Sequence, residues 1–167
     1  NEEPVIHAVV IDDEGQDMSR FSFTVTDERS AQSVSSYLPP EGLVKDRILY
    51  EPCPAFMKSG GFHVIAEHFH AQKIAANTHL YIFEEDSAPE PLPPGRWFLT
   101  ENIVPVQAKA LAPYLPDRKA NLTIRNFPQD IEVLKKKLKL KDGGSVYIFA
   151  ATLSDGSHKL ILCRKRL

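Results

Sequence analysis

The sequence lacks the short motifs that mark the common enzyme sites. No glycine-rich phosphate loop opens a helix after a strand pattern, and no G-x-S-x-G, H-E-x-x-H or C-x-x-C run occurs in the 167 residues. The two cysteines, Cys53 and Cys163, are far apart and show no metal-ligand spacing. We therefore expect thiols without a role, in a reducing compartment, and no catalytic or metal site.

Long hydrophobic runs are also missing. No apolar stretch approaches the roughly 20 residues needed to cross a membrane, and no signal-peptide pattern is present. The hydrophobic fraction of 43% and the charged fraction of 25% are ordinary for folded proteins, which argues against disorder. These values predict a cytoplasmic protein without membrane contact, folded as one compact domain or two small ones.

The charge is divided unevenly along the chain. Residues 1–95 contain 6 Lys and Arg against 16 Asp and Glu, a balance of −10, whereas residues 96–167 contain 14 against 6, a balance of +8. The overall charge of −2 hides this difference. A basic half indicates a surface for an anionic partner such as nucleic acid. The alternatives are that the two halves attract each other, or that the charges are only solvated.

The first half combines strands with short helices. A short β-rich run predicts a strand at Val5–Ile11, and alternation of apolar and polar residues predicts one at 21–26. Apolar residues at helical spacing predict a helix over Phe62–Phe69. The segment 87–95 (SAPEPLPPG) has four prolines and is typical of an extended linker. Because the charge balance also changes there, we place a domain boundary at this segment.

The second half has a β-α-β-β pattern. Strands are predicted at 122–125, 146–152 and 159–163, with a tight hairpin turn at Ser154–Ser157. The intervening helix is expected to begin after an Asn126 N-cap and to end at Gly143-Gly144. The fold class that follows is α+β, with two small units of mixed or antiparallel sheets.

The candidate site consists of cations in this second half. Lys135, Lys136 and Lys139 fall within one arc of the predicted helix, and Arg125 follows a strand directly. Arg164 and Arg166 belong to the Arg-Lys-Arg run near the end of the chain. Together they would form an anion-binding or RNA-binding surface. For the helix, a merely solvated face is the alternative, and for Arg125 an ion pair with a nearby carboxylate.

Other chemistry-bearing residues favour ordinary structural roles. The aromatic side chains of Trp97, Phe98, Tyr147 and Phe149 could stack on bases, but their strand context favours core packing. The histidines at 63, 68, 70 and 79 are interpreted as surface or helix-end residues, not as a zinc site. The carboxylates near Glu84 are interpreted as solvated surface.

Several runs resemble one family of proteins, the bacterial class I S-adenosylmethionine-dependent methyltransferases that carry a THUMP-like domain, in their C-terminal portion. The resemblance is closest to the Bacteroidetes branch, weak over residues 1–47 and more specific from Ile48 to Arg166. The matching runs are Tyr50-Glu51-Pro52, Lys58-Ser59-Gly60, 77–81 (NTHLY), 121–128 (NLTIRNFP) and 138–144 (LKLKDGG).

The resemblance implies a division into a ferredoxin-like segment at 1–47, a helical connecting segment at 48–90 and a THUMP-like domain at 91–167. It places the methyltransferase domain, with its S-adenosylmethionine site and catalytic residues, N-terminal to this chain. No catalytic, cofactor-binding or metal-binding residue is therefore expected here, and the chain alone should be inactive. Its expected partners are that methyltransferase domain and RNA.

Two functional hypotheses remain. In the first, the chain is an accessory region that recognises substrate, binds RNA phosphates through its basic half and presents the RNA for methylation. In the second, the chain is a structural or protein-interaction scaffold for the methyltransferase domain and never contacts nucleic acid. Competition between RNA and a free methyltransferase domain would separate the two hypotheses.

Overall fold

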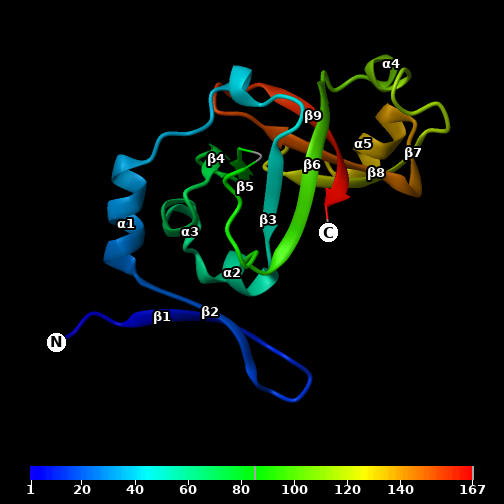
Figure 1. The fold of residues 1–167 in the computed structure, drawn as a ribbon. Coiled ribbons are helices and arrows are strands. Elements are labelled where there is room, and N and C mark those ends of the chain that lie inside the picture. The colour runs from blue at the N-terminus through cyan, green and yellow to red at the C-terminus, as the bar shows by residue number, and fades with distance from the viewer. Residues whose placement is uncertain (85, 167) are drawn as a thin grey trace.

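A computed structural model describes residues 1–84 and 86–166 and shows two sheets with helices packed around them (Figure 1). The elements in chain order are β1 (Val5–Ile11), β2 (Asp17–Thr24), α1 (Val25–Val34), the 3-10 turn η1 (Pro40–Gly42), β3 (Ile48–Pro52), α2 (Pro54–Ser59), α3 (Phe62–Phe69), β4 (Gln72–Ala75), β5 (Thr78–Phe83), β6 (Gly95–Val104), α4 (Ala108–Leu111), β7 (Lys119–Arg125), α5 (Ile131–Leu138), β8 (Lys141–Thr152) and β9 (His158–Arg166).

The larger sheet has seven strands in the order β4-β5-β3-β6-β9-β8-β7. Its neighbouring strands are antiparallel except for β7 and β8, which run parallel and are connected through α5. Strands β1 and β2 form a separate antiparallel hairpin, whose turn projects away from the body in Figure 1. The mixed α+β class expected from the sequence is confirmed.

The seven-stranded sheet runs continuously through the position where the sequence suggested a domain boundary. Strand β3 lies between β5 and β6 and pairs with both. In its pairing with β6, Ile48 is opposite Leu99 and Glu51 is opposite Arg96. The segment 48–90, expected to be a helical connection, supplies three strands in addition to α2 and α3. All five residues of β3 (ILYEP) are buried, which accords with a sequence that does not alternate between apolar and polar residues.

The sheet is strongly curled. Strands β3 and β7 are four strand spacings apart in the sheet order, which would separate them by about 19 Å in a flat sheet. Nevertheless Arg125 at the end of β7 contacts Glu51 of β3 at 2.8 Å. Asn126 Nδ2, just beyond β7, also donates to Thr78 Oγ1 of β5 at 3.2 Å. One face of the sheet is therefore concave, and polar contacts join the edge strand β7 to β3 and β5 across it.

Three hydrophobic clusters fill the two sides of the curled sheet. The concave face holds the cluster that includes Leu49, Phe98, Phe149, Ile161 and Cys163. On the convex face, the hairpin, α1, α2 and α3 cover one half of the sheet. Helices α4 and α5 cover the other half, around the cluster that contains Leu134, Leu138 and Ile148.

Local signals explain the positions of several elements, two of which the sequence predicted. Helix α3 spans Phe62–Phe69, as its apolar spacing indicated. Helix α2 begins at Pro54, whose missing N–H would be unpaired in the first turn. The turn between β8 and β9 falls at the predicted hairpin, where Gly156 has a positive φ of 84°.

The limits of α5 differ from the prediction at both ends. Asp130, not Asn126, is the N-cap, and its side chain accepts a hydrogen bond from the backbone N–H of Glu132. The helix ends at Leu138 because Lys139 adopts the left-handed conformation, with φ at 57°. Gly143 and Gly144 lie instead within β8, beside a register shift in its pairing with β7.

Candidate nucleic-acid interface

The lysines of α5 are presented on the solvent side of a helix whose other side packs on the sheet. Leu134 and Leu138 are fully buried, whereas Lys136 and Lys137 are exposed. Lys139 is exposed as well, but it lies at the left-handed C-cap and not within the helix. The predicted arc is therefore only partly formed, because one of its three lysines caps the helix.

Lys135 is already paired within the molecule. Its Nζ lies 2.9 Å from Asp142 Oδ1 and 3.3 Å from Glu132 Oε1. The hydrogen bond to Asp142, followed by that to Glu132, raises the pKa of the Lys135 ammonium group. Two carboxylates therefore neutralise this lysine, and Lys136, Lys137 and Lys139 remain the lysines of this segment without an ion-pair partner among the described residues.

The basic run at the end of β9 is divided between the two faces of the sheet. Arg164 lies opposite Leu99 and forms a long 3.5 Å ion pair with Glu101. Lys165 lies opposite Phe98 and therefore points to the concave face. Arg164 and Arg166 point to the convex face, on which α5 also packs, and both are exposed.

Arg125 belongs to a buried ion cluster instead of a displayed anion site. Its Nη2 lies 2.8 Å from Glu51 Oε2, and Arg96 Nε lies 2.8 Å from the other oxygen of the same carboxylate. The Glu51 side chain is only 9% exposed. Of the two interpretations open from the sequence, the structure shows the ion pair with a nearby carboxylate.

This cluster has two arginines for one carboxylate. Arg96 also lies over the rings of Phe98 and Phe149, with its guanidinium carbon 5.4 Å and 5.8 Å from their centroids. Arg125 Nη1 donates to the carbonyl of Ile124, whereas its buried Nε has no partner among the described residues. The concave face therefore retains a net positive charge at this point.

The six predicted residues thus do not form one site. Lys135, Lys136, Lys139, Arg164 and Arg166 belong to the convex side, and Arg125 lies on the concave side. Sequence reasoning missed Arg96 and Lys165 as concave-face cations, since only the strand register shows which residues share a face. Because side chains alternate between the two faces of a strand, the sequences of β6 and β9 could have shown that Arg96 shares a face with Phe98, and Lys165 with Cys163.

The four aromatic residues considered for base stacking differ in how deeply they are buried. Trp97, Phe98 and Phe149 are at most 5% exposed, which confirms core packing for all three. Tyr147 is different, because it is only partly buried at the border of the concave cluster.

Glu28 and His63 in the first half have structural roles. Glu28 accepts hydrogen bonds from the backbone N–H groups of His63 and Val64 at the start of α3, and from the His63 ring. The hydroxyl of Tyr37 contacts the other ring nitrogen of His63 at 3.0 Å. His63 is only 5% exposed and lies in the first turn of α3, so of the two interpretations it fits the helix-end residue and not the surface one. These contacts attach α1 and the segment after it to α3.

Two further titratable groups lie near the β4–β5 turn. Lys73 is 2% exposed, and its Nζ donates to the carbonyls of Ala75 and Ala76. Burial lowers the pKa of Lys73 to about 8. His79 stacks on Phe62, and its buried Nδ1 has no hydrogen-bond partner among the described residues. Burial, together with the nearby Lys73 charge, lowers the pKa of His79 to about 4.

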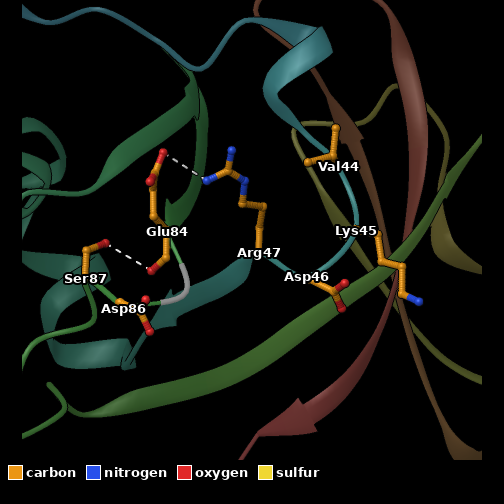
Figure 2. A pocket seen from close by; sticks show the side chains of 7 residues that line it. All are labelled: Val44, Lys45, Asp46, Arg47, Glu84, Asp86 and Ser87. Atoms are coloured by element: carbon orange, nitrogen blue, oxygen red, sulfur yellow. Dashed lines mark hydrogen bonds and ion pairs between the residues drawn. The ribbon is translucent and has the colours of Figure 1, made fainter.

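An open hollow of about 460 Å³ lies between the loop before β3 and the segment after β5 (Figure 2). Arg47 and Glu84 face each other across it and form a 3.0 Å ion pair. Thr100 fixes the loop, because its hydroxyl donates to the carbonyl of Val44 and accepts from the N–H of Arg47. The Arg47–Glu84 ion pair therefore bridges the two segments that border the hollow, at a position too exposed for it to add much stability.

Within residues 1–84 and 86–166, no group of three His, Cys, Asp or Glu side chains is arranged to hold a metal ion. Over the same residues, no helix is long and apolar enough to span a membrane.

Comparison with known proteins identifies two domain families. Residues 49–88 match a family described as a ferredoxin-like domain, and residues 95–165 match one described as THUMP domain-like. The ferredoxin-like match thus lies on the segment that holds β3, α2, α3, β4 and β5, and not on residues 1–47. A search of the curated proteins finds no match.

One solved structure is similar over almost the whole chain. It is the crystal structure of a "putative methyltransferase" from Porphyromonas gingivalis W83, with 30% sequence identity and a TM-score of 0.78. The similarity covers 98% of this chain and 38% of that one, so this chain spans less than two fifths of the neighbour's length. The resemblance noted from the sequence is thereby confirmed.

Proposed function

Because the chain combines a ferredoxin-like domain with a THUMP-like domain, we propose that it is the substrate-recognition region of an S-adenosylmethionine-dependent methyltransferase and that it binds RNA. The similarity to a methyltransferase of much greater length supports an accessory role. On this proposal the catalytic domain belongs to the rest of a longer cytoplasmic bacterial protein, and the chain itself has no catalytic activity.

The observation that carries RNA binding is the group of unpaired cations on the convex side. Lys136, Lys137, Lys139 and Arg166 are exposed and have no ion-pair partner among the described residues. Phosphate groups are the natural partners of such cations, and their neutralisation releases counterions. Contacts of this kind hold and orient RNA without reading its sequence.

S-adenosylmethionine does not fit the residues present. In doubly wound α/β folds, nucleotide-like cofactors bind at the carboxyl ends of parallel strands, where a glycine-rich turn opens a helix. Here β7 and β8 are the one parallel pair in the described part of the sheet, and Arg125 at the end of β7 is held by Glu51. We therefore assign the methyl donor to the proposed catalytic domain and derive no step through it.

Fluorescence anisotropy with labelled tRNA and rRNA fragments tests the proposal at several salt concentrations. Binding should weaken steeply with salt, and the triple variant Lys136→Glu, Lys137→Glu, Lys139→Glu should bind far more weakly with a smaller salt slope. The matched control is Arg29→Glu, Lys45→Glu, Lys58→Glu, which changes the same charge at exposed positions of the first half. Equal binding by both triple variants, or no binding at low salt, would contradict RNA recognition.

A second candidate function is a scaffold that only contacts the catalytic domain. It is favoured by a groove of about 620 Å³ between the β1–β2 hairpin and the proline-rich segment 89–94. Phe21, Phe56, Phe69 and Leu92 line this groove, and the nearby Met18 is 70% exposed. If a separately produced methyltransferase domain bound the chain and RNA did not displace it, while no RNA bound the chain alone, this function would replace the first.

A further inference from the structure

Tyr147 is the aromatic side chain of the concave face that is only partly covered. It lies on β8, beside Cys163 of β9 and Asn121 of β7. Its ring packs against Phe98 with the centroids 5.1 Å apart and the planes tilted by 54°. Phe98 and Phe149, on the same face, are fully buried, so Tyr147 borders the concave cluster and remains accessible from solvent.

Two cations lie on the same face of the sheet as this ring. Lys165 is exposed and follows Cys163 by two residues on the same face, which places it diagonally across from Tyr147 at about 7–8 Å between backbone positions. Arg96 lies over Phe98, the ring that Tyr147 packs against, and its side chain is 39% exposed. The carboxylate of Glu51 is shared by Arg96 and Arg125, so it leaves this face positive.

A polar side chain with a fixed orientation completes the surface. The Asn121 amide Nδ2 donates to the carbonyls of Gly144 and Val146 at 3.0 Å and 3.3 Å. Its amide oxygen is therefore directed away from these carbonyls and can accept a hydrogen bond from a ligand. Asn121 and Tyr147 are register partners, so this acceptor lies next to the ring.

We propose that the concave-face site, defined as Arg96, Asn121, Tyr147 and Lys165, binds single-stranded RNA by stacking a base on Tyr147. Lys165 and Arg96 contact the flanking phosphates, and Asn121 accepts a hydrogen bond from an amino group of the base. This inference rests on the proposed function, to which it adds the class of RNA and a second contact surface.

The chemistry requires a single strand. Stacking on a side chain needs a base whose face is free, whereas bases inside a duplex are already stacked on their neighbours. Asn121, Tyr147 and Lys165 lie on three neighbouring strands about 4.8 Å apart, so they fall within the span of one or two nucleotides. The lysines of α5, on the other side of the sheet, can contact a duplex or a more distant part of the same RNA.

The test measures binding of a fluorescein-labelled single-stranded RNA 12-mer and of a hairpin duplex of equal length to the whole chain at one fixed salt concentration. Tyr147→Ala should weaken binding of the single strand by about 5- to 150-fold, the usual effect of losing one stacked base, and leave the duplex within twofold. Tyr147→Phe keeps the ring and should bind like the parent. Tyr114→Ala, which removes an exposed tyrosine elsewhere, is the matched control.

Crosslinking gives a readout that does not depend on a variant. A single strand with 4-thiouridine at successive positions, irradiated with the unchanged chain, should crosslink to the peptide that contains Tyr147. Crosslinks confined to α5, or unchanged single-strand binding by Tyr147→Ala, would overturn the inference while leaving the proposed function standing. Absence of RNA binding by the parent chain would overturn both.

Discussion

The two halves of the molecule use their charged residues differently. In residues 1–95 three charged groups with internal contacts are buried or partly buried: Glu28 caps α3, Lys73 holds the β4–β5 turn and Glu51 holds two arginines. In residues 96–166 most charged groups are exposed, and Lys136, Lys137 and Lys139 contact no carboxylate among the described residues. These groups of the first half are therefore engaged in internal contacts, whereas the exposed lysines of the second half are available for binding.

Glu51 forms ion pairs that connect the two halves of the chain. It comes from the acidic half, and both of its partners, Arg96 and Arg125, come from the basic half. Since β3 and β7 are far apart in the sheet order, this ion cluster is one of the contacts that keep the sheet curled. The uneven charge distribution along the chain is thus partly an internal attraction and partly an external surface.

The largest effect is expected from Glu51→Gln. The change leaves two arginines without their carboxylate, and removal of one partner of a buried ion pair is strongly destabilising. Because the arginine side chains are 39% and 33% exposed, we reduce the expected loss of unfolding free energy to about 3 kcal/mol. Urea denaturation measures it, and Glu101→Gln, which removes the exposed Arg164 pair, is the control. Equal midpoints for the two variants would show that the cluster does not hold the sheet.

The second effect concerns Lys73 in alkaline solution. Burial lowers its pKa to about 8 in the folded chain, against 10.5 for the unfolded chain. The unfolded state then binds more protons, so stability rises with pH, by about 2 kcal/mol between pH 7 and 9.5. Lys73→Met should lack this rise. The difference between the two stability curves is the quantity to measure, because cysteine and tyrosine contributions cancel in it; parallel curves would contradict the buried charge.

The third effect concerns His79 in acid. Burial lowers its pKa to about 4, below the ordinary value of 6.5, so the folded chain resists protonation and loses stability as the pH falls from 6.5 towards 4. We expect about 1 kcal/mol from this group between pH 6.5 and 4.5, because its side chain is only partly buried. His79→Phe keeps the stack on Phe62 without a titrating group. Its stability should fall less with acid; an identical fall would exclude His79 as the cause.

Sequence patterns predicted the local elements well and the assembly of the sheet poorly. Helix α3 and the β8–β9 turn were predictable because each depends on residues that are neighbours in the chain. The curl of the sheet was not, because it depends on Glu51 meeting Arg125, which lies 74 positions later in the sequence. The end of α5 at Lys139 was also missed, since glycine is the usual residue for a left-handed cap and two glycines follow closely.

The difference between local patterns and strand register also explains which residues of the candidate site could be predicted from the sequence. The helical period identified the exposed Lys136 but missed the exposed Lys137, and it included the paired Lys135. The faces on which Arg125, Arg164 and Lys165 lie depend instead on strand register. Tyr147 could be separated from Phe98 and Phe149 only after the register and the burial of each ring were known. The composition of the basic half was thus informative about the kind of partner, but not about the surfaces that would contact it.

The smallest effect is expected from the exposed lysines, and it is the sharpest test of the comparison between the halves. Lys136→Ala and Lys137→Ala remove charges that contact no carboxylate among the described residues, and alanine is a good helix former. Each should change the unfolding free energy by no more than about 0.5 kcal/mol, as is usual at exposed positions. Urea denaturation at low and at high salt measures this change. A loss comparable with that of Glu51→Gln would mean that the second half also uses its charges for stability, and the argument for an RNA surface would lose its basis.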